Sequence, residues 1–146
     1  GKALGKLGPG DLVLTTYTLA ARDIESLAAV RFGSFVLDEA QAVKNATTER
    51  SKALRRIDAG WRLGLTGTPV ENHLGEVWSL MRVISPGFLG SWEQFRGRFA
   101  VPIEKYGDKE RRAALAALLR PFVLRRTKAE VARDLPARTE LVKKVA

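Results

Sequence analysis

The alternation of short apolar runs with helical patterns over residues 1–84 is the feature that most restricts the fold. Three of the apolar runs are rich in β-branched or aromatic residues, which favour buried strands. These runs are residues 11–17, 34–38 and 61–67. Strands that alternate with helices across short links form a parallel sheet, with right-handed crossovers and helices on its faces. The sequence therefore predicts an α/β fold for this part of the chain.

Helical patterns follow each of these runs. Apolar residues recur three and four positions apart at 18–31 and at 74–84, as they do on the inner face of a helix. Between these two segments, Thr47 or Thr48 is placed to cap a helix that reaches about Ile57. The predicted order is strand, helix, strand, helix, strand, helix.

The chain changes character after residue 90. Ser91 and Gln94 have the spacing of a capping box, which predicts a short helix to about residue 99. The other segments expected in this part are an irregular loop at 100–108, a helix at 109–119, an extended run at 122–127 and a short helix at 128–135. We therefore expect two parts, residues 1–90 and a mainly helical extension at 91–146.

Positive charge is concentrated in the second part. Residues 1–95 have 11 Lys and Arg against 10 Asp and Glu, and residues 96–146 have 14 against 6, so +1 and +8 make up the net charge of +9. A basic segment attracts polyanions, above all nucleic acid, although a merely solvated basic face is an equally good interpretation of charge alone.

Composition excludes several kinds of site. The chain has no cysteine and a single histidine, His73, so disulfides, thiolate metal sites and multi-histidine metal sites are excluded. No apolar run approaches the roughly 20 residues that span a membrane, so no membrane partner is expected.

Two adjacent acids, Asp38 and Glu39, end the buried run at 34–38. Ligands of a parallel sheet bind at the carboxyl ends of its strands. Neighbouring carboxylates repel each other unless a positive charge is near, and Mg²⁺ satisfies both their charge and its own preference for oxygen ligands. The pair therefore predicts a magnesium-nucleotide site, with a plain surface strand end as the alternative.

A second polar segment, "LTGTP" at 65–69, ends the next expected strand. The hydroxyls of Thr66 and Thr68 and the flexible Gly67 are expected beside Asp38, because the carboxyl ends of parallel strands meet at one edge. An ordinary turn after a strand is the alternative.

Four segments together resemble one family, the Swi/Snf-type DNA-translocating ATPases of helicase superfamily two. They are "LVLTTY" (12–17), "DEAQAVKN" (38–45), "LTGTPVEN" (65–72) and "RPFVLRRTKAEVARDLPARTE" (120–140), in the family's order. The resemblance implies a partial RecA-like lobe of the P-loop NTPase class, namely the back half of the first lobe. It implies ATP and Mg²⁺ as cofactors and double-stranded DNA as a partner.

The resemblance also implies roles for single residues. Asp38 would coordinate Mg²⁺, Glu39 would position or activate the attacking water, and Gln41 would sense the nucleotide. Thr66, Gly67 and Thr68 would couple the nucleotide state to the DNA-facing surface. The residues expected to bind nucleic acid are Thr15, Thr16, Lys44, Arg125, Arg126 and Lys128. The alternatives for Lys44 are support of the loop after the acids and a helix-entry role, and the alternative for the basic residues at 125–128 is a solvated basic edge. Plain strand packing is the alternative for Thr15 and Thr16 and the preferred interpretation of Tyr17.

The sequence departs from the family in what it lacks. The phosphate-binding loop G-x-x-x-x-G-K-[ST] is not found, and "GKALGKL" at 1–7 is one residue short between its glycines. The second lobe, which supplies arginine fingers, is also missing. We therefore expect the isolated chain to hydrolyse ATP negligibly, with the remaining parts of the same protein as its partners.

Two alternatives stay open at this point. One is a non-catalytic scaffold that binds nucleic acid or protein, and the other is a strand-separating helicase of the same superfamily. An intracellular location is expected, cytoplasmic in a bacterium or nuclear in a eukaryote. Strand edges left uncovered are expected to cause self-association or low stability.

Overall fold

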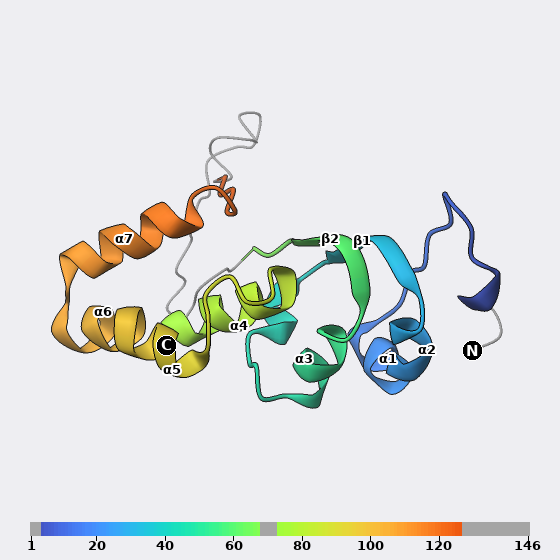
Figure 1. Cartoon of the computed structure of the whole chain (residues 1–146), viewed down its shortest axis with the longest axis horizontal. Coiled ribbons are helices and arrows are strands. Elements are labelled where there is room, and N and C mark those ends of the chain that lie inside the picture. The colour runs from blue at the N-terminus through green and yellow to red at the C-terminus, as the bar shows by residue number, and fades with distance from the viewer. Residues whose placement is uncertain (1–3, 68–72, 127–146) are drawn as a thin grey trace, which may run out of the picture. The chain divides into compact units, whose positions relative to one another are not determined.

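The structure is a computed structural model that describes residues 4–67 and 73–126. The chain divides into two compact units, Gly1–Arg112 and Ala113–Ala146. In the described residues up to 84, the strands are β1 (Arg31–Leu37) and β2 (Asp58–Gly64). The helices in the same range are η1 (Leu4–Lys6), α1 (Tyr17–Arg22), α2 (Ile24–Ala28), η2 (Ala40–Val43), α3 (Glu49–Leu54) and α4 (Leu74–Ile84). Figure 1 shows α1, α2 and α3 on one side of the two strands.

The two strands pair in parallel, with Arg31 beside Asp58 and Leu37 beside Gly64. The connection between them contains η2 and α3, which is the crossover that a parallel pair requires. A side chain at Gly64 would meet α4, because a Cβ there would lie 2.6 Å from Ile84 Cδ1. This glycine lets the helix approach the end of β2 closely.

The core of the first unit lies between the sheet and the helices. Its buried apolar residues come from α1, α2, β1, η2, α3, the turn after α3 and α4, and they are Ala20, Ile24, Leu27, Leu37, Ala40, Val43, Ala53, Leu54, Ile57 and Val83. Arg62 of β2 is half-buried next to this core, and its guanidinium donates hydrogen bonds to the carbonyls of Ile57 and Val83. A charged group can stay here because its donors are paired.

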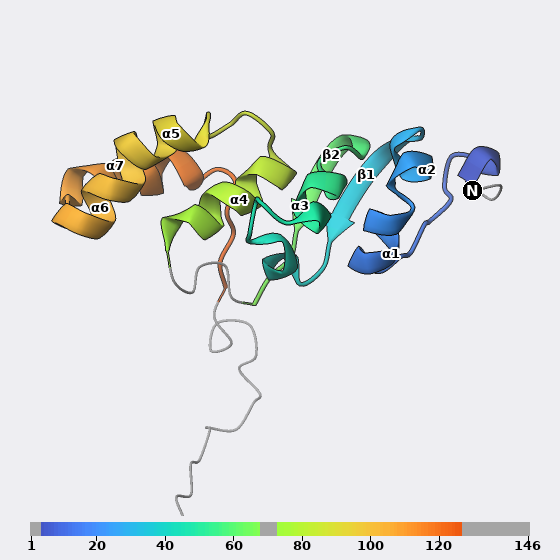
Figure 2. The ribbon, with the colours of Figure 1, turned by 90° about the horizontal axis from the view of Figure 1, so that it is seen from below.

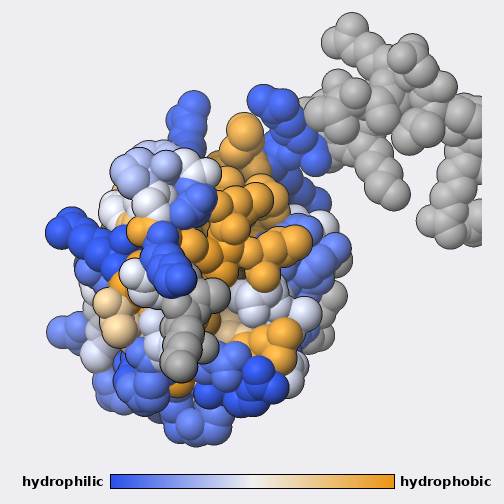
Figure 3. All heavy atoms as spheres, turned by 90° about the vertical axis from the view of Figure 1, so that its right-hand side faces the viewer, coloured by the Kyte–Doolittle hydropathy of each residue, from blue (hydrophilic) through white to orange (hydrophobic). Residues whose placement is uncertain are grey.

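Apolar side chains are exposed on the other face of the sheet. Val36 pairs with Leu63 across the two strands, and they are 50% and 41% exposed. Trp61 in β2 and Leu65 just after it are also about half exposed, at 52% and 48%. Figure 3 shows a hydrophobic patch on the side of the molecule that includes β1. An uncovered apolar area of this kind marks a contact surface.

The expected strand at 11–17 is wrong, because residues 11–16 form no strand and Tyr17 begins α1. Thr16 instead caps α1, because its side-chain oxygen accepts a hydrogen bond from the Leu19 N–H. Leu12 and Leu14 are 88% and 91% exposed, so nothing in the described residues gives this run a neighbour to pair with. A strand is stable only beside a partner.

Other expectations hold with shifted boundaries. The helix expected at 18–31 forms as two short helices, α1 and α2, that meet at Asp23. Strand β2 begins three residues before the expected run, at Asp58, and ends at Gly64. The helix at 74–84 is confirmed, and the helix capped by Thr48 forms but ends at Leu54, three residues before the expected end at Ile57.

The segment after residue 90 is more helical than expected. The capping box is confirmed, with Ser91 and Gln94 bonded reciprocally, and it opens α5 (Trp92–Phe95). The π-helical turn η3 (Arg96–Ala100) and α6 (Val101–Tyr106) follow, so the loop expected at 100–108 is wrong for 100–106. Pro102 lies in the first turn of α6, where a helix tolerates the missing N–H, and Ile103 is buried. Figure 2 shows the helical ribbon continuing from α5 into α6.

The second unit is described only in part. Helix α7 (Lys109–Leu119) starts before it and confirms the helix expected at 109–119. Residues 120–126 contain neither helix nor strand, and the helix expected at 128–135 lies outside the described residues. Within residues 4–67 and 73–126, no helix has the length and apolarity to cross a membrane.

The exposed sheet face yields a first prediction. We expect the isolated chain to self-associate at rising concentration, and Leu63→Gln to weaken that association because it makes the apolar face polar. Sedimentation equilibrium measures the dissociation constant. Leu118→Gln is the matched control, since Leu118 is similarly exposed, at 37%, but lies in α7. A monodisperse monomer at all concentrations contradicts the prediction.

Candidate functional site

The backbone between the two acids is held in a strained conformation. Glu39 has φ 50° and ψ 51°, and it is the only non-glycine residue with positive φ in the part of the chain that the structure describes. This left-handed region costs a residue with a Cβ about 1–2 kcal/mol. Such strain persists only where the surroundings fix the backbone.

Hydrogen bonds hold both ends of the peptide group that joins Asp38 to Glu39. The Asp38 carbonyl accepts a bond of 2.5 Å from the Tyr17 hydroxyl. The Glu39 N–H donates to Asp38 Oδ1 at 3.0 Å. The orientation of this peptide group, and with it the left-handed turn, is therefore fixed from two directions.

The loop that carries the acids is also tied to the end of β2. The Leu65 N–H donates to the Leu37 carbonyl, and the Ala40 N–H donates to the Leu65 carbonyl, both at 2.8 Å. The parallel ladder thus continues past the two strands and holds the acid loop beside the threonine turn. The sequence predicted this shared edge.

Side chains connect the acid loop to the threonine turn. Gln41 Nε2 donates to Glu39 Oε2 at 2.6 Å, and the Thr66 hydroxyl donates to Gln41 Oε1 at 2.7 Å. The Gln41 amide therefore bridges the Glu39 carboxylate, which follows β1, and the Thr66 hydroxyl, which follows β2. Asp38 and Glu39 themselves are exposed, and their carboxylates are open to a ligand.

Tyr17 is a candidate that the sequence analysis assigned to packing. Burial and then the negative charges of Asp38 and Glu39 raise the pKa of Tyr17, although Arg50 acts in the opposite direction. The Arg50 guanidinium carbon lies 5.9 Å from the centre of the Tyr17 ring. No sequence pattern places a tyrosine from residue 17 against residue 38, because the contact is tertiary.

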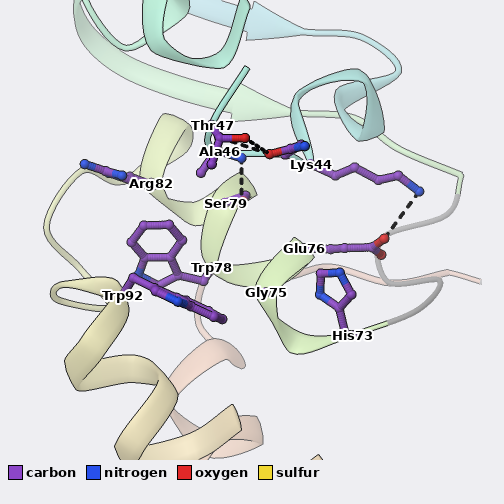
Figure 4. A pocket seen from close by; sticks show the side chains of 11 residues that line it. Lys44, Ala46, Thr47, His73, Gly75, Glu76, Trp78, Ser79, Arg82 and Trp92 are labelled. Carbon is purple, nitrogen blue, oxygen red and sulfur yellow. Dashed lines mark hydrogen bonds and ion pairs between the residues drawn. The ribbon is translucent and has the colours of Figure 1, made fainter. Parts of the chain in front are cut away.

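A second connection joins the segment that follows the acids to α4. Lys44 Nζ lies 3.3 Å from Glu76 Oε1, and the side chain of Glu76 is only 5% exposed. The Ala46 N–H donates to Ser79 Oγ at 3.1 Å. Figure 4 shows Lys44 reaching towards Glu76 of α4. The sequence analysis missed Glu76 and Ser79, because their helix read simply as amphipathic.

A pocket of about 540 Å³ lies beside this connection. Its aromatic wall is formed by Trp78 and Trp92, whose ring centres are 5.4 Å apart. The Arg82 guanidinium lies 4.9 Å from the Trp78 ring centre, and Trp78 Nε1 donates to the Gly90 carbonyl. These contacts join α4 to α5 and account for both tryptophans as packing residues.

Thr15 and Thr16 are exposed, although Thr16 also caps α1. Arg125 and Arg126 are exposed in the second unit, and Gly67 follows Thr66 in an exposed bend. Two further predicted site residues, Thr68 and Lys128, lie outside the described residues.

The carboxylates of Asp38 and Glu39 fit Mg²⁺ chemically. Mg²⁺ prefers oxygen ligands and is usually held by one or two carboxylates, with waters and substrate phosphates completing its shell. In the described ranges, no three His, Cys, Asp or Glu side chains gather in a metal-binding group. Two acids on one loop match the small number of protein ligands that magnesium in a nucleotide site needs.

The family assignment follows from sequence similarity across the chain. A sequence profile described as the SNF2-related domain matches residues 5–146. This chain belongs to the SNF2-related domain family.

Relatives in bacteria and eukaryotes share this segment. YwqA of Bacillus subtilis is 46% identical over 132 residues, which are 89% of this chain and 14% of YwqA. The TATA-binding protein-associated factor MOT1 of Saccharomyces cerevisiae is 39% identical over 142 residues, 90% of this chain and 8% of MOT1. The Zorya protein ZorD of Escherichia coli is 41% identical over 139 residues, 94% of this chain and 13% of ZorD. The chain thus spans about a seventh or less of these relatives.

Solved structures agree on the fold. The SWI2/SNF2 ATPase core of Sulfolobus solfataricus in complex with double-stranded DNA matches 86% of this chain and 27% of its own, with a TM-score of 0.77 and 44% identity. A second structure, of the SWI2/SNF2 ATPase core domain of Sulfolobus solfataricus, matches 90% of this chain and 27% of its own, with a TM-score of 0.74 and 43% identity. The parallel strands and flanking helices are those of a RecA-like ATPase core, which confirms the predicted fold class.

The strain at Glu39 yields a second prediction. The free energy of unfolding of the Glu39→Gly variant is expected to be about 1 kcal/mol higher than that of Glu39→Ala, because glycine adopts positive φ without a Cβ clash. Urea unfolding of both variants measures the difference. The same two substitutions at Glu49 are the control. Glu49 is helical in α3, so the alanine variant should be the more stable one there. Equal stabilities at residue 39 contradict the strain.

The ion pair of Lys44 and Glu76 yields a third prediction. Lys44→Met is expected to lower the free energy of unfolding by about 2 kcal/mol, because it weakens the compensation of a buried carboxylate. Adding Glu76→Gln should restore part of the loss, since the buried charge is then gone. Arg56→Met, which breaks the exposed pair with Glu25, is the control and should cost less. A double variant no more stable than Lys44→Met alone contradicts this role.

Proposed function

We propose that this chain is the back half of the first RecA-like lobe of an ATP-dependent motor that translocates along or remodels double-stranded DNA. The observation that carries the proposal is the chain of hydrogen bonds from Glu39 through Gln41 to Thr66. It joins the acid loop to the threonine turn in a family whose solved members include an ATPase core bound to double-stranded DNA.

The acid pair has the chemistry for the hydrolytic step. Mg²⁺ bound at this site would neutralise charge on the nucleotide phosphates. Asp38 would hold the ion, directly or through water, with its second carboxylate oxygen, because Oδ1 accepts the Glu39 N–H. Glu39 orients the attacking water and accepts its proton, as a general base within hydrogen-bond reach does.

Gln41 has the geometry to report the state of the nucleotide. Its amide contacts Glu39 on one side and the Thr66 hydroxyl on the other. A change at Glu39 during hydrolysis alters the partner of the Gln41 amide group, and therefore the bond to Thr66. In this proposal, Thr66, Gly67 and Thr68 pass that change to the surface that contacts DNA.

The proposed DNA contacts come from hydroxyls and basic groups. Thr15 and Thr16 are exposed just before α1, and Arg125 and Arg126 are exposed in the second unit. Together with Lys44 and Lys128, they would bind the phosphate backbone, so affinity should fall steeply with salt. Base contacts are not needed for such a grip, which fits a motor that moves along any sequence.

Flanking parts of the same protein would complete the motor. The relatives are at least seven times longer than the segment they share with this chain, which leaves room for a phosphate-binding loop and a second lobe. The exposed apolar face at Val36 and Leu63 supports a covering partner. We place the motor inside the cell, where its DNA lies.

The fourth prediction tests this function. In the full-length protein, Glu39→Gln is expected to lower DNA-stimulated ATP hydrolysis by roughly 10²–10⁴-fold, because a general base is lost. Nucleotide binding should persist. The isolated chain should be inactive without a phosphate cradle and an arginine finger, because the finger alone is worth roughly 10³–10⁵ in rate. A phosphate-release assay with and without duplex DNA measures each case.

Glu49→Gln is the matched control, since it removes an exposed carboxylate from α3 instead. Full activity in the Glu39→Gln protein would contradict the assigned chemistry. An active isolated chain would contradict the need for flanking parts. Absence of ATP hydrolysis in the unmodified full-length protein would favour a scaffold, and strand displacement by it would favour a helicase.

A further inference from the structure

The peptide group between Asp38 and Glu39 has one hydrogen bond that comes from outside its own loop. Its N–H is bonded locally, to the carboxylate of Asp38. Its carbonyl is bonded to the hydroxyl of Tyr17, which lies 21 residues earlier in the chain. Rotation of this peptide group changes ψ of Asp38 and φ of Glu39 together. The tyrosine bond therefore acts on the angle that makes Glu39 left-handed.

The position of Tyr17 is itself well defined. It is the first residue of α1, directly after Thr16, whose side chain caps the helix at Leu19. Helix α1 packs on the core through Ala20, and Arg50 of α3 lies against the Tyr17 ring.

We propose that Tyr17 is a positioning residue for the acid pair, whose hydroxyl holds the peptide group between Asp38 and Glu39 in the orientation that directs both carboxylates. What the carboxylates then do rests on the proposed function, whereas the geometric role does not. Without the hydroxyl, Glu39 is free to leave the left-handed region, which relieves strain and turns its carboxylate away from Gln41. Both carboxylates are still present in such a variant, but they no longer point towards the same site.

The test is Tyr17→Phe in the full-length protein, which removes one oxygen and keeps the ring beside Arg50. Hydrogen–deuterium exchange without nucleotide is the first readout. The amides of Glu39 and Ala40 are expected to exchange about fivefold faster, which is the effect of losing one hydrogen bond. Peptides from β2 and α4 should exchange as before.

Steady-state ATP hydrolysis with saturating duplex DNA is the second readout. We expect the Mg²⁺ concentration for half-maximal rate to rise about fivefold and kcat to fall by a similar factor. Tyr106→Phe is the matched control, because Tyr106 is 70% exposed in α6. It should change neither readout.

The outcomes separate this proposal from simple destabilisation and from the proposed function. Wild-type exchange at residues 39 and 40 in Tyr17→Phe overturns the positioning role. Faster exchange throughout the first unit, with an unchanged Mg²⁺ requirement, also overturns it, because that pattern is general loosening. If Glu39→Gln keeps full activity, the proposed chemistry fails, and the local exchange result still decides whether Tyr17 positions the acids.

Discussion

Two backbone hydrogen bonds beyond the ends of the strands hold the whole site together. They join Leu65 to Leu37 and Ala40 to Leu65, so the parallel ladder does not stop where β1 and β2 formally end. The side-chain bond between Thr66 and Gln41, which joins the two segments, depends on this close approach. The sheet thus builds a polar site from two segments that are 25 residues apart, as Gln41 and Thr66 are.

The meeting of the acid loop and the threonine turn was predictable from sequence, because parallel strands bring their carboxyl ends to one edge. The capping box at Ser91 was predictable for the same kind of reason, since both of its bonds are local. The failed strand at residues 11–16 shows the limit: the composition was right, but a strand also needs a partner. The left-handed Glu39 and the bond from Tyr17 were not predictable, because both come from tertiary contacts that no local pattern encodes.

Lys44 illustrates how a basic residue near a motif acquires two interpretations. The family resemblance implies a contact with nucleic acid, whereas its ammonium group lies 3.3 Å from the buried carboxylate of Glu76. The buried acid needs a positive charge close by, and a phosphate of DNA would compete for the same ammonium group. The two interpretations are compatible, because an ammonium group has three N–H donors, and competition between a carboxylate and a phosphate weakens each contact without excluding either.

The small number of acids at the site has a thermodynamic consequence. Two carboxylates on one loop leave most of the coordination shell of a magnesium ion to waters and phosphate oxygens. In the proposed function, an ion and a nucleotide that share this shell would change each other's affinity by the same factor, because such coupling is reciprocal. A site of this kind discriminates by the direction of its few oxygens rather than by their number. The conformation of one peptide group, held between Tyr17 and the Asp38 carboxylate, therefore matters more here than it would in a site with many ligands.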